Sequence, residues 1–342
     1  MKKVVFTMLQ LAVTAAVLYY VFHDPKKLHQ MWQALEQADY RWVFAAVGAY
    51  IIVEIAAALR WQILLRVQGI YLNWPRLFGL FLIGMFFNQF LPGGTGGDII
   101  KSYLLLKETP GKKPGALLAV LFDRLIGLLA LVVITAVLIF LRYDWLTQTS
   151  ETRRYVWPVL VALGISILGL ATTFLISGFN LAAKLPKEFP AREKLIEISA
   201  AYHLYARHWT GSIFAFLISL VAHLATFTTF LFVAYTLRAD VRLVDFFAVM
   251  PIERTISAIP ISFAGEGPRE HILQVMLSGL CGVEPGVAAL IGTMSFLIIL
   301  LCCLPGGIVY FFYKPSGAIR HVRMREMETE VATLEHEIGR SE

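Results

Sequence analysis

The feature that most constrains this chain is a series of long apolar runs separated by short polar connections. An apolar run of about 18 residues or more, coiled as a helix that rises about 1.5 Å per residue, is long enough to cross a hydrocarbon core of about 30 Å. The sequence therefore predicts an all-α polytopic integral membrane protein with about six full transmembrane helices. The runs are Val4–Phe22, Val43–Leu65, Leu117–Leu141, Val156–Ser177, Ile213–Leu237 and Val287–Phe312.

The composition excludes an ordinary soluble enzyme. Apolar residues make up 58% of the 342 residues and charged residues only 16%, whereas a soluble domain has about 25% charged residues. The net charge of +6 is assigned to cytoplasmic loops and anionic lipid head groups rather than to nucleic acid. The first run follows Met-Lys-Lys and lacks a small-x-small cleavage site, so it is predicted to be a retained span rather than a signal peptide.

Two further apolar segments are too short to cross the membrane and are broken by glycine and proline. In residues 77–106, Leu77–Leu91 runs into Pro92-Gly-Gly-Thr-Gly-Gly-Asp98 and then Ile99–Leu106. In residues 244–280, Val244–Ile259 runs into a Pro/Gly-containing break and then His271–Leu280. Two half-length helices joined by such a break predict a re-entrant hairpin, because irregular backbone is tolerated at membrane depth only where protein or a cavity satisfies it.

The distribution of basic residues predicts the topology. With the N-terminus in the cytoplasm, 18 Lys and Arg residues fall on the inner side and 8 on the outer side, which is the direction of the positive-inside rule. The two hairpins then enter from opposite sides, as expected for inverted repeats. Residues 1–313 form the predicted membrane domain, 178–211 a cytoplasmic loop with an interfacial helix, and 314–342 a polar helical tail, so both termini are expected in the cytoplasm.

Charged residues at membrane depth mark the candidate binding site. Each such charge costs about 2.5–3.5 kcal/mol on insertion scales and therefore needs a reason. The charges gather around the two glycine-rich breaks, where missing side chains and helix N-termini would let backbone N–H groups approach an anion such as phosphate. The candidate substrate-binding residues are Arg60, Asn88, Gly93, Gly94, Gly96, Gly97, Asp98, Lys101, Asp123, Arg124, Glu253, Arg254, Gly265, Glu266, Gly267, Arg269 and Glu270.

Structural interpretations of the same residues stay open. The acids and bases are nearly balanced and could simply neutralise one another, and Asp98 could act as a helix N-cap. His223 is interpreted as a helix-packing histidine, and Cys302 and Cys303 as small buried side chains. The sequence has no P-loop, dinucleotide fingerprint, H-E-x-x-H or G-x-S-x-G motif, so neither a cofactor nor a metal is expected.

Four stretches resemble the lysylphosphatidylglycerol synthase transmembrane, or flippase-like, family. They are F-N-Q-F-L-P-G-G-T-G-G-D-I-I-K-S-Y-L-L (87–105), A-L-R-W-Q-I-L-L-R (58–66), F-D-R-L-I-G-L (122–128) and I-P-I-S-F-A-G-E-G-P-R-E (259–270). Glu266 and Pro268 depart from the pattern, since family members more often have small or aliphatic residues there. The resemblance implies a membrane protein that translocates or handles lipids. The short tail leaves no room for the aminoacyl-transferase domain of some members, so lysyl-lipid synthesis is not expected.

The function expected from the residues and the resemblance is that of a lipid flippase, not an enzyme. It would move a phosphate-bearing, polyprenyl-linked or aminoacylated lipid across the bacterial inner membrane, driven by the lipid gradient or by coupled ions. Two alternatives stay open: an intramembrane head-group transferase that uses a buried carboxylate as a general base, and a scaffold whose tail recruits a synthase. The expected partners are membrane lipids, a lipid-synthesis enzyme and a second copy of the chain, and no nucleic acid.

Overall fold

The computed structural model describes residues 19, 23–90, 96–109, 111–178, 196, 200, 203–257 and 267–313. Every regular element in these ranges is an α-helix. Several predictions fall outside the described residues: the span Val4–Phe22, the hairpin tips with Gly93, Gly94, Gly265 and Glu266, most of the loop 178–211, and the tail 314–342. The helices are α2 (Pro25–Glu36), α3 (Arg41–Val67), α4 (Trp74–Phe90), α5 (Gly96–Glu108), α6 (Lys113–Leu146), α7 (Ser150–Gly178), α10 (Trp209–Thr236), α11 (Leu243–Ser257), α12 (Pro268–Cys281) and α13 (Pro285–Phe312).

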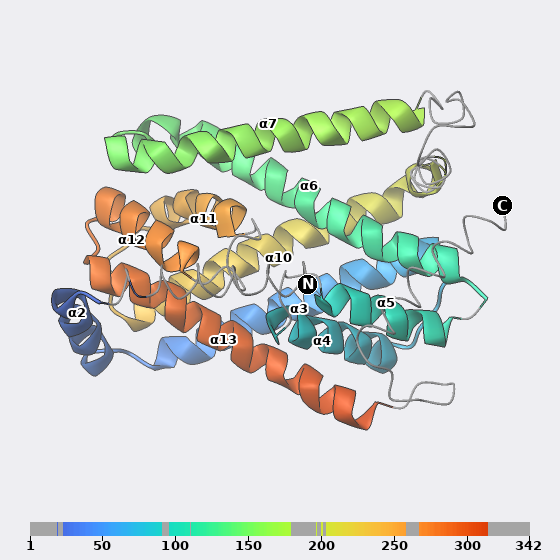
Figure 1. Ribbon diagram of the computed structural model, residues 1–342, viewed down its shortest axis with the longest axis horizontal. Helices are drawn as coiled ribbons and strands as arrows, with labels where there is room; N and C mark the ends of the chain where they lie inside the picture. Colours follow the sequence, from blue (N-terminus) through green and yellow to red (C-terminus); the bar gives the residue numbers. More distant parts are fainter. Residues whose placement is uncertain are drawn as a thin grey trace, which may run out of the picture.

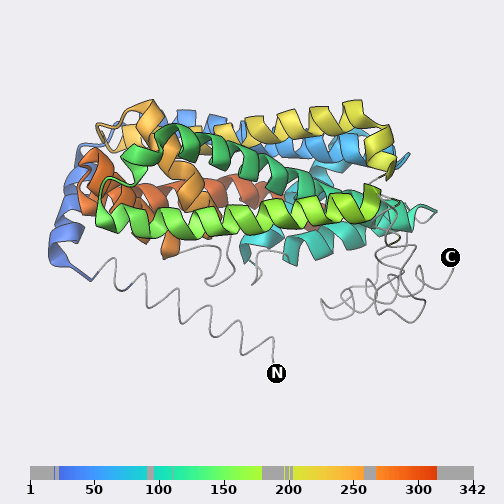
Figure 2. The same cartoon turned by 90° about the horizontal axis from the view of Figure 1, so that it is seen from above.

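Four of the predicted spans are confirmed as long apolar helices. α3, α6, α10 and α13 have 27, 34, 28 and 28 residues and are apolar enough to cross a membrane. α7, with 29 residues, is helical over the predicted span Val156–Ser177. The long helices run along one axis of the molecule, and α2 lies across one end of them (Figures 1 and 2).

The outer surface of the bundle is apolar, as lipid contact requires. Large exposed side chains include Phe44 on α3, Phe140 on α6, Ile165 on α7 and Phe311 on α13. In water such a surface would be unstable, because each exposed apolar side chain loses the free energy gained on burial. A hydrocarbon core removes that penalty, so the surface agrees with the apolar composition.

Each hairpin consists of two helices shorter than the membrane is thick. α4 and α5 have 17 and 13 residues, or about 25 and 20 Å, and α11 and α12 have 15 and 14 residues, or about 22 and 21 Å. α4 begins at the end of the bundle where α3 ends at Val67, and α5 returns to it (Figure 1). α11 begins at the opposite end, where α3 starts at Arg41, and α12 returns to that end (Figure 1). These two ends are called the Val67 end and the Arg41 end.

Glycine allows the two helices of the first hairpin to touch. A Cβ atom added to Gly97 would lie 1.9 Å from the backbone oxygen of Gly84, a distance that no real side chain tolerates. The Gly97 N–H donates a hydrogen bond of 2.9 Å to Asn88 Oδ1, which ties the start of α5 to the end of α4. This close contact fixes the direction in which the first turn of α5 presents its side chains.

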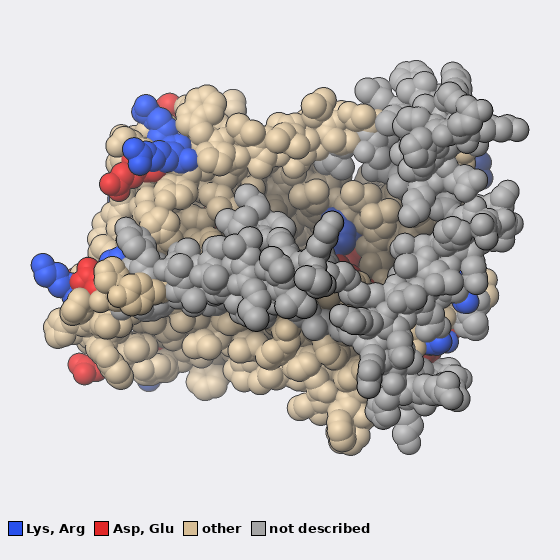
Figure 3. Space-filling view, viewed as in Figure 1, with Lys and Arg blue, Asp and Glu red and all other residues tan. Residues whose placement is uncertain are grey.

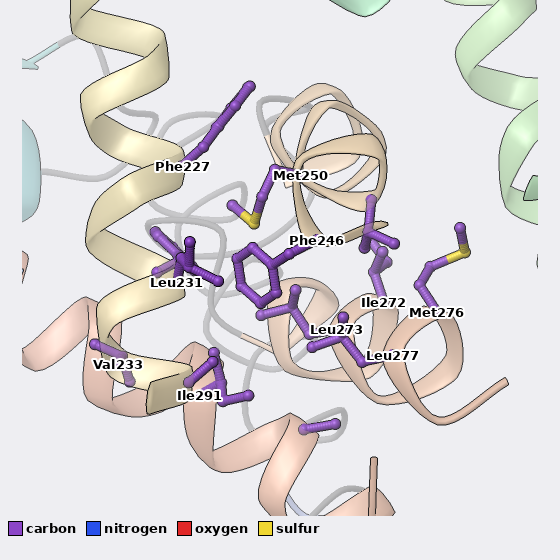
Figure 4. Close-up of a cluster of buried hydrophobic side chains, with 14 of the residues drawn as sticks. Phe227, Leu231, Val233, Phe246, Met250, Ile272, Leu273, Met276, Leu277 and Ile291 are labelled. Carbon is purple, nitrogen blue, oxygen red and sulfur yellow. The ribbon is translucent and has the colours of Figure 1, made fainter. Parts of the chain in front are cut away.

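The second hairpin is fixed by a capped helix start and by a large apolar core. Gly267 has φ of 87°, a conformation that favours glycine, and its N–H donates a hydrogen bond of 2.6 Å to Glu270 Oε2. Phe246 and Met250 of α11 and Leu273 of α12 are fully buried with residues of α10 and α13 (Figure 4). The first hairpin has a separate core around Trp61 of α3. Each hairpin is therefore packed as a unit; the predicted inverted-repeat relation between them stays a prediction.

Candidate functional site

Five charged residues from three helices form a connected group, here called the Arg60 cluster. Its members are Arg60 of α3, Asp98 and Lys101 of α5, and Asp123 and Arg124 of α6. Arg60 Nε lies 2.7 Å from Asp123 Oδ1, and Lys101 Nζ lies 3.5 Å from Asp123 Oδ2 and 3.8 Å from Asp98 Oδ1. Arg124 donates to Asp98. These charge pairs thus connect α3, α5 and α6 without a break.

Local features of the neighbouring helices orient the cations. Arg60 Nη1 donates a 3.2 Å hydrogen bond to Ser219 Oγ of α10, and a Cβ atom at Gly127 would lie only 2.9 Å from that nitrogen. Lys101 Nζ lies 4.6 Å from the centre of the Trp61 ring, a favourable cation–π position. Asp98 stands in the first turn of α5, where the helix dipole favours a negative charge.

The Arg60 cluster combines buried charges with one exposed guanidinium. The side chains of Lys101 and Asp123 are each 5% exposed, that of Arg60 is 13% exposed and that of Arg124 is 51% exposed. Arg124 lies 11 residues from the start of α6 at Lys113, or about 16 Å along the helix axis, and within the predicted span Leu117–Leu141. Three cations stand against two carboxylates, so the cluster has a formal surplus of one positive charge.

Charged side chains are visible from one face of the molecule. Figure 3 shows basic and acidic atoms within a recess near the middle of this face, and a second group of charged atoms at its upper left edge. The exposed half of Arg124 belongs to a helix whose neighbouring side chains Leu121 and Leu128 are also exposed. A group approaching from the side of the bundle, and not only from its ends, therefore reaches this guanidinium.

The second hairpin has its own buried charges, here called the Glu253 cluster: Glu253 and Arg254 of α11, and Arg269 and Glu270 of α12. Glu253 and Glu270 are fully buried and Arg269 is 3% exposed. Arg269 Nε lies 3.5 Å from Glu270 Oε1, and its guanidinium carbon lies 5.0 Å from the centre of the Phe296 ring. Neither carboxylate oxygen of Glu253 has a hydrogen-bond partner in the part of the chain that the structure describes.

His223 of α10 lies between the two clusters. Its Nε2 is 3.0 Å from the Gly127 carbonyl oxygen, and the charges of both Arg60 and Arg254 act on it. The hydrogen bond to α6 agrees with the packing role expected for this histidine. Among the described residues, no ion pair links the Arg60 cluster to the Glu253 cluster.

The predicted site residues that the structure describes fall into these two clusters. Asn88, Gly96 and Gly97 lie beside the Arg60 cluster, and Gly267 caps the helix that carries Arg269 and Glu270. Gly93, Gly94, Gly265 and Glu266 lie outside the described residues. The predicted joint action of Arg60, Arg124, Arg254 and Arg269 on one ligand is therefore not tested by the contacts.

Sequence reasoning missed several residues that orient the charges. These residues contact the cations but are uncharged, so a search for charges in apolar segments does not find them. They are Ser219, Gly127, Trp61 and Phe296. Trp61 and Gly127 stand within the matched stretches 58–66 and 122–128, which is the only signal that pointed to them. No group of three or more His, Cys, Asp or Glu side chains among the described residues is placed to hold a metal ion.

Part of the predicted interfacial helix is inserted into the bundle. Tyr205 is 3% exposed; its ring lies 4.0 Å from that of Phe122, and its hydroxyl donates to the Leu64 carbonyl at 3.2 Å. Phe122 immediately precedes Asp123 on α6. Tyr205 thus fastens the segment before α10 next to the Arg60 cluster, and not on the membrane surface alone.

Comparison with known proteins identifies the family. The family model described as "Lysylphosphatidylglycerol synthase TM region" matches residues 7–307. The chain is 25% identical over 281 residues to a UPF0104 membrane protein of Methanothermobacter thermautotrophicus, covering 78% of this chain and 83% of the relative. It is 27% identical over 143 residues to a UPF0104 membrane protein of Pyrococcus horikoshii, covering 41% and 40%. No solved structure matches. The chain belongs to the family of the lysylphosphatidylglycerol synthase transmembrane region and is an integral membrane protein.

Proposed function

We propose that the protein moves a lipid with an anionic, phosphate-bearing head group across the membrane and that the Arg60 cluster binds this head group. The observation that carries the proposal is the surplus positive charge of this cluster at membrane depth, with Arg124 51% exposed. An uncompensated cation in hydrocarbon is unfavourable, and an anionic ligand would relieve that cost. Phospholipids, polyprenyl-linked phosphates and aminoacylated lipids all have a phosphate that fits.

The geometry suggests how binding would proceed. In the structure Arg124 donates a hydrogen bond to Asp98. A phosphate offers a guanidinium two acceptor oxygens in a fork-to-fork arrangement, so it would replace Asp98 as the partner of Arg124. Asp98 would then stay paired with Lys101, which lies 3.8 Å away. In a lipid that also has an amino group, the released carboxylate would receive the ammonium.

The hairpins supply the elements that would move. Broken half-length helices that enter from opposite ends are typical of transporters that work by rocking around a site at the midplane. We propose that the first hairpin, which carries Asp98 and Lys101, shifts relative to α6 and so opens the Arg60 cluster to one leaflet and then to the other. The proposed location is the bacterial inner membrane with both termini in the cytoplasm, and the proposed activity is transport rather than catalysis.

The experiment is a lipid-translocation assay with the full chain in vesicles. A fluorescent phosphatidylglycerol is added to phosphatidylcholine vesicles, and its leaflet distribution is followed by chemical quenching of the outer leaflet. Arg124→Gln should lower the translocation rate to that of protein-free vesicles, because neutral glutamine cannot replace the fork of donors. Arg154→Gln, which changes an exposed arginine in the first turn of α7, is the matched control and should move lipid at the wild-type rate.

Three results would contradict the proposal. Translocation by Arg124→Gln at the wild-type rate would remove the Arg60 cluster from the mechanism. Chemical conversion of the labelled lipid by the pure protein would favour a transferase, and wild-type protein without any translocation would favour a scaffold. Size-exclusion chromatography of both variants in detergent shows that any loss is not caused by unfolding.

A further inference from the structure

The Glu253 cluster contains buried carboxylates that the proposed lipid site does not use. Glu253 and Glu270 stand with Arg254 and Arg269, and Glu54 of α3 is a third buried carboxylate, 5% exposed. The charges of Glu54 and Arg254 both act on Tyr50, but no charge of the cluster acts on Glu54 itself, so Glu54 is not counted in the cluster. The cluster itself therefore has two carboxylates and two guanidiniums and, unlike the Arg60 cluster, no surplus of charge.

Within the cluster, Glu253 is the carboxylate that has no hydrogen bond among the described residues. Glu270 accepts from Gly267 N–H at 2.6 Å and lies 3.5 Å from Arg269, whereas Glu253 is fully buried and neither of its oxygens is bonded among the described residues. The Ser257 hydroxyl, one turn further along α11, lies nearby without reaching hydrogen-bonding geometry. An ionised carboxylate so placed is desolvated without any hydrogen bond to replace water, and taking up a proton removes that cost.

The surroundings leave Glu253 sensitive to the state of the cluster. The charges that act on it are Arg254 on its own helix and Arg269 and Glu270 on α12. The other helices packed against α11 place their titratable groups elsewhere: Arg142 of α6 pairs with Asp245 at the start of α11, Tyr155 of α7 bonds His271, and His223 of α10 lies near Arg254. A small movement of α11 against α12 would thus change which guanidinium faces Glu253.

We propose that Glu253 binds and releases one proton in each transport cycle and so couples lipid movement to a proton gradient. This inference rests on the proposed function. The proton enters from the water on one side, converts the carboxylate to a neutral carboxylic acid, and leaves on the other side after the hairpins rock. Movement of a lipid with one negative charge together with one proton is electrically neutral, so the membrane potential would not oppose it.

The position of Glu253 fits this role. It lies 10 residues from the start of α11 at Leu243, or about 15 Å along the helix, and so near the middle of the membrane. A proton is favoured over a metal cation because sodium or calcium requires several oxygen ligands around the ion, whereas one proton requires a single carboxylate oxygen. A sodium gradient is therefore the control ion in the test.

The test separates this inference from the proposed function. Vesicles with the full chain and fluorescent phosphatidylglycerol are given a pH difference of one unit, with the membrane potential clamped to zero by potassium and valinomycin. The wild type should accumulate lipid in one leaflet by up to about tenfold, because one proton per lipid moves down a tenfold concentration difference. Glu253→Gln should still move lipid without a gradient but show no gradient-driven asymmetry, and the exposed control Glu151→Gln should behave as the wild type.

Infrared spectroscopy supplies a readout that does not depend on transport. The wild type and Glu151→Gln should show a carboxylic-acid band that titrates with pH and is missing in Glu253→Gln. Equal asymmetry in Glu253→Gln and the wild type, an unchanged band, or asymmetry driven by sodium instead of protons each overturns the inference. If the wild type moves lipid without responding to pH, only the proton coupling fails, and if it moves no lipid at all, the proposed function fails as well.

Discussion

Gly97→Ala should disrupt the first hairpin and, through it, the Arg60 cluster. The added Cβ atom would lie 1.9 Å from the Gly84 carbonyl oxygen and 2.7 Å from the Asn88 backbone nitrogen and Cγ. Real Cβ atoms stay at least 3.0 Å from such atoms, so α5 and α4 must separate by about 1.1 Å, the difference between 3.0 and 1.9 Å. Both obstacles include backbone atoms, which cannot turn aside as a side chain does.

The expected loss of stability is that of overpacking, about 1–3 kcal/mol, together with the weakened hydrogen bond from Gly97 N–H to Asn88. The displacement also shifts Asp98, the next residue, relative to its partner Arg124 on α6, so translocation should fall more steeply than stability. Gly164→Ala is the matched control, since a Cβ atom there meets nothing within 4 Å and alanine favours a helix by about 0.5–1 kcal/mol.

Thermal unfolding in detergent and lipid translocation in vesicles measure the two effects on the same preparations. We expect Gly97→Ala to unfold at a lower temperature than the wild type and to move lipid more slowly, and Gly164→Ala to do neither. If Gly97→Ala is as stable and as active as Gly164→Ala, the contact between α4 and α5 does not position Asp98, and the reasoning is refuted.

Three further predictions concern other contacts. Asp123→Ala leaves two buried cations without their shared carboxylate and should destabilise the protein by about 3–5 kcal/mol in chemical denaturation, whereas Asp144→Ala at an exposed position should change little; equal effects would mean that the buried ion pairs contribute nothing. Tyr313→Phe removes a 2.6 Å hydrogen bond to Glu108 and should cost about 1 kcal/mol. Burial and that hydrogen bond raise the pKa of Tyr313, so the wild type should lose stability as the pH rises above about 10, while Tyr313→Phe lacks this loss; identical pH profiles would contradict it. Gly306→Ala places a Cβ atom 2.0 Å from a backbone oxygen of α4 and should lower the unfolding temperature; an unchanged temperature would show that α13 and α4 separate freely.

The membrane architecture follows from the sequence because apolar length determines it. The runs around residues 43–65, 117–141, 213–237 and 287–312 exceed the thickness of a hydrocarbon core, and each is a long helix in the structure. The half-length segments were recognised for the same reason, since glycine and proline interrupt them before that thickness is reached. α2, in contrast, was not predicted. In the sequence its twelve residues Pro25–Glu36 resemble a charged connection, and their packing against α13 is visible only in the structure.

The grouping of the charges could not be derived from the sequence. Lys101 and Asp98 are one turn apart on α5, and any helix model brings them together. The pairing of Arg60 with Asp123, 63 residues away, depends on how α3 and α6 rotate about their axes. That rotation is set by packing at Gly127 and by Ser219, whose roles have no periodic signature. For the same reason the sequence could not show that Arg269 pairs with its own neighbour Glu270.

The sideways exposure of Arg124 has a consequence for what the protein selects. A water-soluble ligand would have to leave the water and pass the exposed leucine side chains beside Arg124 before it reached the guanidinium. A lipid already diffuses laterally in the bilayer at the level of these leucines. Its head group can reach Arg124 while its acyl chains stay in the surrounding lipid. Discrimination against free phosphate and soluble phosphate esters would then result from the route of entry, without any contact that recognises the tails themselves.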